Sequence, residues 1–274
     1  MPYEVKPAED TMLRSLYIFP YMTGKQLTQL LYSRGSYKEV LAKLKRLTDN
    51  GYVLRKPLPS QIQSGSVPYV YWLADTGRKY LKGLGYDFTN WRHPSEMKLV
   101  HSAHFWHALS VNDFLIAGAN IANTHPDLTL VDIRHDLIIS RNMQLPCRCD
   151  GWMDFRIRNK EQQCLWLELD RGTEKVKVFK EKVACLVTYA KGNYERDFGT
   201  PSITIAFATT ELEHRGGEMR SWCEQVLTAM NMIYEADLFR FLALPEQYDP
   251  EWLYLAPVWE KPFDSGKSAL LEIG

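Results

Sequence analysis

Apolar residues recur at helical spacing through the first third of the chain. Residues 8–19 carry one such pattern. A Thr and a Gln three positions apart then open TGKQLTQLLY, which is the spacing of a capping box and predicts a second helix over about residues 24–32. The same device opens SYKEVLAKLKRLTDNG, where Ser36 is the expected cap of a third helix and Gly51 its expected left-handed end.

Two short apolar runs follow this helix. YVLRKPL and PYVYWLADTG read as strands on either side of the polar loop PSQIQSGS. Three helices and a two-stranded hairpin resemble a winged helix-turn-helix, and VLAKLKRLTDNGYVLRK is similar to the recognition helix and first wing strand of bacterial winged-helix regulators. The resemblance covers about residues 8–84 and implies binding to double-stranded DNA, with the third helix in the major groove.

The resemblance also indicates which residues would contact DNA. Residues at the start of the third helix lie nearest the base edges, and basic side chains contact phosphates. The expected base contacts are Arg34, Ser36, Tyr37 and Lys38, and the expected phosphate contacts are Lys43, Lys45, Arg46, Arg55 and Lys56. The alternative is that the module binds protein, since modules of this kind also serve as protein–protein platforms.

The remaining two thirds of the chain alternate between helical and strand patterns. Residues 85–98 read as a connection, and a long helix then ends before Pro126. The expected strands are 128–139, 151–158, 163–169, 202–210 and 238–244, and the expected helices are 173–190 and 217–235. The order α-β-β-β-α-β-α-β predicts a mixed α/β (α+β) fold, and the tail from residue 245 shows no clear periodicity.

Acidic residues mark the second and third of these strands. CRCDGWMDF places Asp150 at the start of the second strand, and LELD places Glu168 and Asp170 two positions apart on the third, hence on one face. This layout resembles the PD-(D/E)xK nuclease core, a restriction-endonuclease-like fold. The resemblance implies that the three acids are catalytic and bind Mg²⁺, or Mn²⁺, which lowers the pKa of an attacking water.

The chain departs from the nuclease pattern at the lysine. Asp170 occupies the strand position of the usual Lys, and Cys149 replaces the usual Pro. Lys182, in the following helix, is the expected catalytic substitute, because the Lys has moved to that helix in some members of the superfamily. Two alternatives stay open. Asp154 shares a strand face with Asp150 and competes as the ligand, or the acids only form salt bridges.

A second resemblance covers most of the chain. CDGWMDF, LELDRGTE and FKEKVACLVTYAKG, preceded by a helix with ALSVNDF, are similar to the replication-relaxation family of bacterial mobile elements. The matching residues are His101, Asn112, Asp150, Glu168, Asp170, Arg171, Gly172, Thr173, Lys182 and Tyr189. This resemblance spans about residues 8–210 and implies DNA and plasmid replication, relaxation or transfer.

Composition and charge indicate the expected partner and cellular location. The formal net charge is zero, but residues 1–90 hold 13 Lys and Arg against 7 Asp and Glu, which favours a nucleic-acid contact there. No apolar run reaches the roughly 18 residues of a membrane span, and the N-terminus lacks the pattern of a signal peptide, so we expect a cytoplasmic protein with no membrane contact. Cys147 and Cys149 read as ordinary thiols, and the helical His101, His104 and His107 as structural rather than metal ligands.

Together these observations predict three segments. They are a winged helix-turn-helix over residues 1–90, a nuclease-like domain over 99–245 and a C-terminal tail over 246–274. The leading hypothesis is a DNA-binding protein that cuts or nicks DNA with a divalent metal. The alternative is a non-catalytic regulator of transcription or replication, whose nuclease-like domain serves dimerisation or the docking of a replication or transfer protein.

Overall fold

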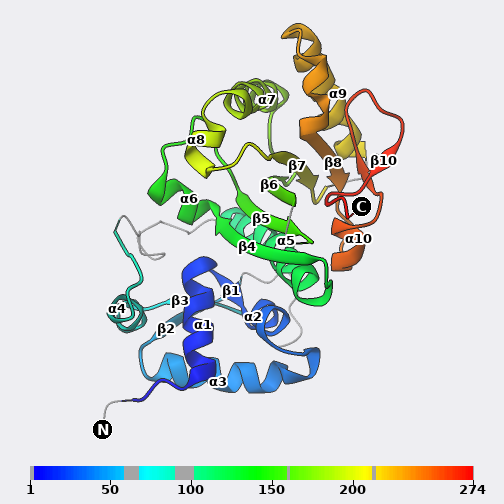
Figure 1. Cartoon of the computed structure of the whole chain (residues 1–274). Helices are drawn as coiled ribbons and strands as arrows, with labels where there is room; N and C mark the ends of the chain where they lie inside the picture. Colours follow the sequence, from blue (N-terminus) through cyan, green and yellow to red (C-terminus); the bar gives the residue numbers. More distant parts are fainter. Residues whose placement is uncertain (1–2, 59–67, 90–101, 159–160, 212–213, 274) are drawn as a thin grey trace. The chain divides into compact units, whose positions relative to one another are not determined.

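The computed structural model describes residues 3–58, 68–89, 102–158, 161–211 and 214–273 (Figure 1). The chain divides into two units, Met1–Ile116 and Ala117–Gly274. Helix α5 (Ser102–Thr124) contributes to both units. Helices and two β-sheets make up the described part of the chain, which confirms the mixed α/β fold.

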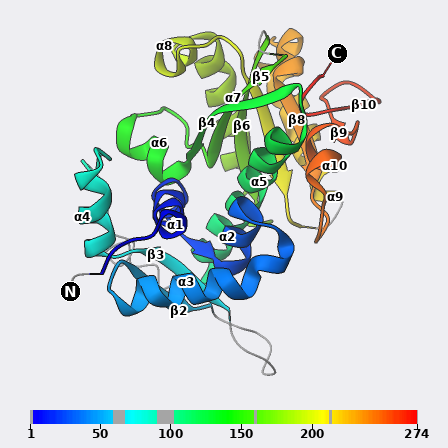
Figure 2. The ribbon, with the colours of Figure 1, turned by 60° about the horizontal axis from the view of Figure 1, so that its bottom comes forward.

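The first unit combines helices with a small antiparallel sheet. Its helices are α1 (Pro7–Ile18), α2 (Gly24–Leu31), the short 3₁₀ helix η1 (Arg34–Ser36), α3 (Tyr37–Asp49) and α4 (Asp75–Gly83). Its described strands are β1 (Met22–Thr23), β2 (Val53–Pro57) and β3 (Tyr69–Leu73), in the order β1-β3-β2. Helix α3 contacts β2, and Figure 2 shows the two elements near each other.

Local signals explain two helix ends in this unit. The capping box at α2 is confirmed, because the Gln26 N–H donates to Thr23 Oγ1 at 3.1 Å and the Thr23 N–H donates to Gln26 Oε1 at 3.0 Å. Gly51 has the expected left-handed backbone, with φ +73°. The capping box predicted at Ser36 is wrong. The turn η1 precedes α3 directly, and no side-chain hydrogen bond caps that helix.

The second unit is built on a mixed sheet. Seven strands of the described chain form it, in the order β10-β9-β8-β7-β6-β5-β4. They are β4 (Leu128–His135), β5 (Gly151–Ile157), β6 (Glu161–Asp170), β7 (Thr204–Thr209), β8 (Phe239–Ala243), β9 (Trp259–Glu260) and β10 (Lys267–Ser268). Strands β4, β5 and β6 pair antiparallel, whereas β6, β7 and β8 run parallel. The second and third expected strands, β5 and β6, are therefore antiparallel neighbours in the sheet.

Helices cover both faces of this sheet. The helices are α6 (Asp136–Asn142), α7 (Val176–Lys191), α8 (Tyr194–Phe198), α9 (His214–Ala229) and α10 (Pro250–Tyr254), with the 3₁₀ helix η2 (Ile233–Leu238). Helices α7, α8 and α9 bury an aromatic core on one face, which includes Trp166, Phe179 and Phe207. On the other face, Gly118 of α5 lies so close to Met153 and Tyr254 that an added Cβ would be 2.4 Å from Met153 Cε. An added Cβ at residue 118 would therefore require the ends of the Met153 and Tyr254 side chains to shift.

Two sequence predictions fail in this unit. The strand predicted over residues 128–139 ends at His135, because α6 starts at Asp136 with a His135 ring nitrogen accepting from the Leu137 N–H at 3.4 Å. The tail after residue 245, where the sequence pattern shows no periodicity, contains α10 and also β9, which extends the sheet beside β8. Its Tyr254 and Trp259 are fully buried.

The second failed prediction concerns a cysteine. Cys147 is bonded to Cys185 of α7 as a disulfide, and so is not an ordinary thiol. The two residues are 38 positions apart, but α7 packs on the sheet face beside the loop that leads into β5, which brings their Cα atoms within 6.3 Å. Cys149 is a free, buried thiol, as predicted.

Candidate functional site

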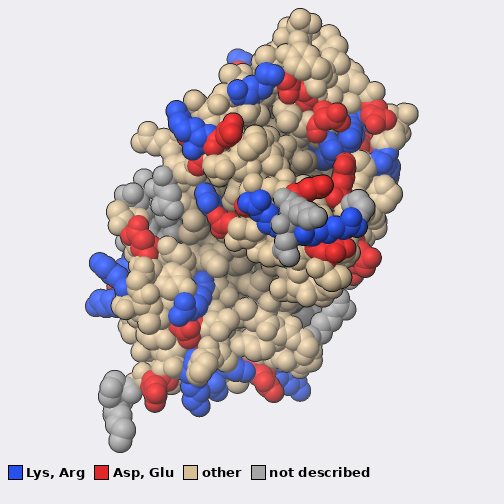
Figure 3. Space-filling model, viewed as in Figure 1, with Lys and Arg blue, Asp and Glu red and all other residues tan. Residues whose placement is uncertain are grey.

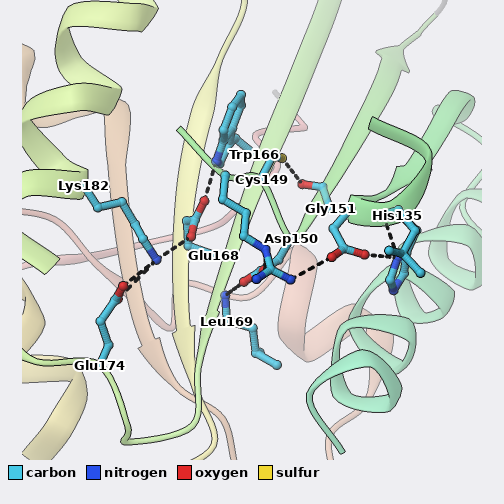
Figure 4. A network of polar contacts seen from close by, with 12 residues as sticks. His135, Cys149, Asp150, Gly151, Trp166, Glu168, Leu169, Glu174 and Lys182 are labelled. Carbon is cyan, nitrogen blue, oxygen red and sulfur yellow. Dashed lines mark hydrogen bonds and ion pairs between the residues drawn. The ribbon is translucent and has the colours of Figure 1, made fainter. Parts of the chain in front are cut away.

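Asp150 and Glu168 lie side by side at one end of the sheet in the second unit. Asp150 precedes β5 directly, and its main-chain N–H donates to the Leu167 carbonyl at 3.1 Å. Its carboxylate Oδ2 accepts the main-chain N–H of Leu169 at 2.9 Å. These two bonds flank Glu168 on β6, so strand pairing itself brings the two acids together (Figure 4).

Glu168 is held on both carboxylate oxygens. Its Oε1 accepts the indole N–H of Trp166 at 2.8 Å, and its Oε2 lies 2.9 Å from Lys182 Nζ on α7. The same ammonium is 2.9 Å from Glu174 Oε1, so Lys182 bridges two carboxylates (Figure 4). Lys182, predicted to reach back from the following helix, therefore contacts the acid on β6.

Burial sets the electrostatics of this pair. Glu168 is only 2% exposed, and burial raises the pKa of its carboxyl above the ordinary value, against the opposing charge of Lys182. Burial alone would lower the pKa of the Lys182 ammonium, but Glu168 and Glu174 outweigh it and raise that pKa. Lys182 is thus a firmly charged group beside partly desolvated acids.

A second set of contacts joins Asp150 from the side of β4 and α6. The Asp136 N–H donates to the Asp150 carbonyl at 3.0 Å, and Asp136 Oδ1 lies 2.5 Å from His135 Nδ1. An Arg148 nitrogen is 2.9 Å from Asp136 Oδ2, and another is 3.8 Å from Asp150 Oδ1. Burial opposes ionisation of Asp136, but His135 and Arg148 outweigh it and hold the pKa of that carboxyl far below its usual range.

The sequence analysis did not identify His135, Asp136 or Arg148 as candidate site residues. His135 and Asp136 fall inside the run that reads as a single strand, so their position at a strand end and helix start is hidden. Arg148 had a usable signal, since it stands two positions before Asp150 in CRCD. Below, the polar network means His135, Asp136, Arg148, Asp150, Trp166, Glu168, Glu174 and Lys182.

Asp170 is engaged by a different partner. Its Oδ2 lies 2.8 Å from Arg215 Nε on α9, and its Oδ1 accepts the Glu174 N–H at 3.4 Å. Arg215 also donates to the Glu174 carbonyl at 2.8 Å, which ties the turn after β6 to α9. Gly172 in this turn has φ +72°, a backbone that favours glycine.

Asp154 lies away from Asp150 and Glu168. It pairs across the hairpin with Cys164, and its Oδ2 accepts from the Gln162 side chain at 2.9 Å. Trp152 lies between Asp154 and Asp150 along the chain. No group of three or more His, Cys, Asp or Glu side chains is arranged to hold a metal ion in the parts of the chain that the structure describes.

In the first unit, three predicted DNA contacts lie at the start of α3 and two on β2. Tyr37, Lys38, Arg55 and Lys56 are exposed, and Ser36 is partly exposed. The Arg55 guanidinium lies 4.4 Å from the centre of the exposed Tyr69 ring. Arg34 belongs to η1, but its side chain is outside the described residues.

The other three predicted contacts form ion pairs within the unit. Lys43 pairs with Glu39 at 3.6 Å and Lys45 with Asp49 at 2.6 Å, both one helical turn apart. Figure 3 shows acidic side chains interspersed with basic ones on the face that it draws. Arg46 lies 3.0 Å from the carboxylate of Glu9, which is fully buried. Arg46 thus has a structural partner in α1.

Two residues that match the replication-relaxation pattern, Asn112 and Tyr189, hydrogen-bond to other parts of the fold. The Asn112 side chain donates to the Tyr21 carbonyl within the first unit, and Tyr189 donates to Asp197 at 2.9 Å. His101 and the side chain of His104 lie outside the described residues. Among the helices that the structure describes, none has the length and apolar character needed to cross a membrane.

Comparison with known proteins identifies a family. A family model described as replication-relaxation matches residues 13–201. This range includes Asp150, Glu168, Asp170 and Lys182 and ends before β7. No curated protein and no solved structure matches the chain significantly.

Proposed function

Because the chain belongs to the replication-relaxation family, we propose that it acts on DNA in the replication or relaxation of a mobile genetic element. The first unit binds duplex DNA as a winged helix-turn-helix. The second unit is a nuclease-like domain of the PD-(D/E)xK type, which cuts or nicks the strand with a divalent metal. The setting is the cytoplasm, and the ligand is double-stranded DNA.

One observation carries the nuclease proposal. Asp150 and Glu168 come from adjacent strands, and a lysine from the next helix lies 2.9 Å from Glu168. A hydrolytic site for a phosphodiester needs carboxylate oxygens for a hard cation and a positive charge beside the phosphate. Lys182 supplies that charge although Asp170 occupies the usual strand position.

The donor set fits a divalent cation held by few protein ligands. The polar network contains four carboxylates and two permanent cations, Arg148 and Lys182. The excess of negative charge suits a doubly charged cation. Mg²⁺ commonly uses one or two carboxylates and keeps several waters, and Asp150 and Glu168 would be those ligands. Such an ion supplies Lewis acidity and lowers the pKa of a bound water. Asp170, paired with Arg215, would support the turn rather than the ion.

The remaining contacts orient the carboxylates of Asp150 and Glu168 and place a positive charge for a phosphate. The Leu169 N–H fixes the Asp150 carboxylate, and the Trp166 indole fixes one oxygen of Glu168. Lys182, anchored by Glu174, holds a positive charge where a phosphate would add negative charge.

The alternative is a non-catalytic regulator. It is favoured by the contacts of the acids themselves, because Glu168 has protein partners on both oxygens and Asp170 is paired with Arg215. In that case the second unit would serve dimerisation or the docking of a replication or transfer protein.

A cleavage experiment separates the two functions. Supercoiled and linear DNA are incubated with Mg²⁺ or Mn²⁺ and the wild type, the Asp150→Ala, Glu168→Ala variant, or the control Asp154→Asn. Nicked or linear product from the wild type and control, but not from the double variant, supports the nuclease. Salt-sensitive binding without cleavage by any of them supports the regulator. Equal cleavage by all three would refute the site.

A further inference from the structure

Arg148 is the charged side chain of the polar network that is most open to solvent. Its side chain is 65% exposed, against 22% for Lys182, 14% for Asp136 and 7% for Asp150. A guanidinium carries five N–H donors, and the contacts with Asp136 and Asp150 use only its Nε and one terminal nitrogen. The group thus lies between the acids and the solvent.

The chain around Arg148 is fixed on both sides. Cys147, its neighbour, is tied by the disulfide to Cys185 of α7. On the other side, the Cys149 thiol contacts the Gly151 carbonyl at 3.1 Å, and the Asp150 main chain pairs with β6. An exposed arginine on so constrained a backbone loses less conformational freedom when it binds a ligand.

Asp136 aims the guanidinium. Its Oδ2 contacts Arg148 at 2.9 Å, and its Oδ1 lies beside the ring of His135, which is 2% exposed. His135 and Asp136 therefore form a buried support behind an exposed cation.

We propose that Arg148 binds a backbone phosphate of DNA at the solvent-exposed side of the polar network, with Asp136 as its positioning residue. The inference rests on the proposed function and names a residue that delivers the substrate to that site. A phosphate beside Asp150 and Glu168 meets like charges, and Arg148 lies where it offsets this repulsion. The planar guanidinium suits two parallel hydrogen bonds to a phosphate, with the edge turned away from Asp136.

The test measures DNA binding by the full chain, without metal. Affinity for a fluorescein-labelled duplex is followed by fluorescence anisotropy between about 50 and 200 mM salt. Removing one phosphate contact reduces the slope of log affinity against log salt by about 0.9. We expect this reduction for Arg148→Gln, with a several-fold weaker affinity. Arg148→Lys keeps the slope but only part of the affinity, and Asp136→Asn weakens binding although Arg148 keeps its charge.

Arg158→Gln is the matched control. Arg158 is likewise an exposed arginine, 3.8 Å from an aspartate, Asp127, but it follows the opposite end of β5. Its replacement should leave affinity and slope unchanged. Equal losses in Arg158→Gln and Arg148→Gln, or no loss in Arg148→Gln, would overturn the proposal while duplex binding by the wild type still stands. If the wild type binds no DNA, the proposed function itself fails, and the inference fails with it.

Discussion

Replacing Lys182 with Met tests the central ion pair. The change keeps a long unbranched side chain and removes the ammonium group 2.9 Å from Glu168. Removing one partner of a buried ion pair lowers the free energy of unfolding by about 3–5 kcal/mol, because the other charge stays desolvated. Glu168 is almost fully buried, but the Lys182 side chain is 22% exposed, so water can replace part of its role. We therefore expect Lys182→Met to lower the free energy of unfolding by about 3 kcal/mol, the lower end of this range.

The assay is urea unfolding in EDTA, followed by tryptophan fluorescence. Trp152 and Trp166 are buried in the second unit and report its unfolding. Lys180→Met is the matched control, since Lys180 lies on the same helix, is only partly buried and bonds the neutral Gln225. Lys180→Met should change the free energy of unfolding by no more than about 0.5 kcal/mol.

The Glu168→Gln, Lys182→Met double variant decides the physical cause. With the Glu168 carboxylate also gone, the carboxylate that still lacks its Lys182 partner is that of Glu174, whose side chain is 19% exposed and so keeps contact with water. Most of the lost stability should therefore return. A double variant as unstable as Lys182→Met would show that lost packing, and not the stranded carboxylate, causes the effect. A Lys182→Met variant as stable as Lys180→Met would refute the ion pair itself.

Three further predictions test the rest of the fold. Cys147→Ser opens a disulfide that spans 38 positions, which by loop closure lowers the free energy of unfolding by about 4 kcal/mol; thermal unfolding with and without dithiothreitol measures it, and a wild type insensitive to reduction would contradict it. Glu9 is buried, yet hydrogen bonds from Tyr3, Arg46 and the backbone outweigh burial and lower its pKa, so its contribution is present above the unfolded pKa of about 4.3 and lost as pH falls through the folded value. Unfolding followed across acidic pH should therefore be less pH-dependent in Glu9→Gln than in the wild type. Gly118→Ala should lower stability by about 1–3 kcal/mol through overpacking, whereas Gly217→Ala, where an added Cβ meets nothing within 4 Å, should not; urea unfolding compares them.

Local signals in the sequence were enough for much of the secondary structure. Helix α2 follows its capping box, α3 ends at a left-handed Gly51, and β5 and β6 appear where apolar runs flank a polar turn. These features depend on residues a few positions apart, which a linear pattern contains. The same patterns failed at residues 136–142, where a run of apolar residues is compatible with strand or helix and tertiary packing makes it α6.

The candidate site divides in the same way. The sequence by itself determined which acids stand at the start of one strand and on the next, whereas Lys182 was expected beside them only from the resemblance to the nuclease core. Only the tertiary structure decided the partners: Lys182 for Glu168, Arg215 for Asp170, Asp136 for Arg148 and Cys185 for Cys147. Each partner comes from an element 12 to 45 positions away along the chain, and which side chains meet depends on the strand register and on how α7 and α9 pack on the sheet. Such contacts over long separations leave no periodic trace, so they follow from the packed fold and not from local pattern.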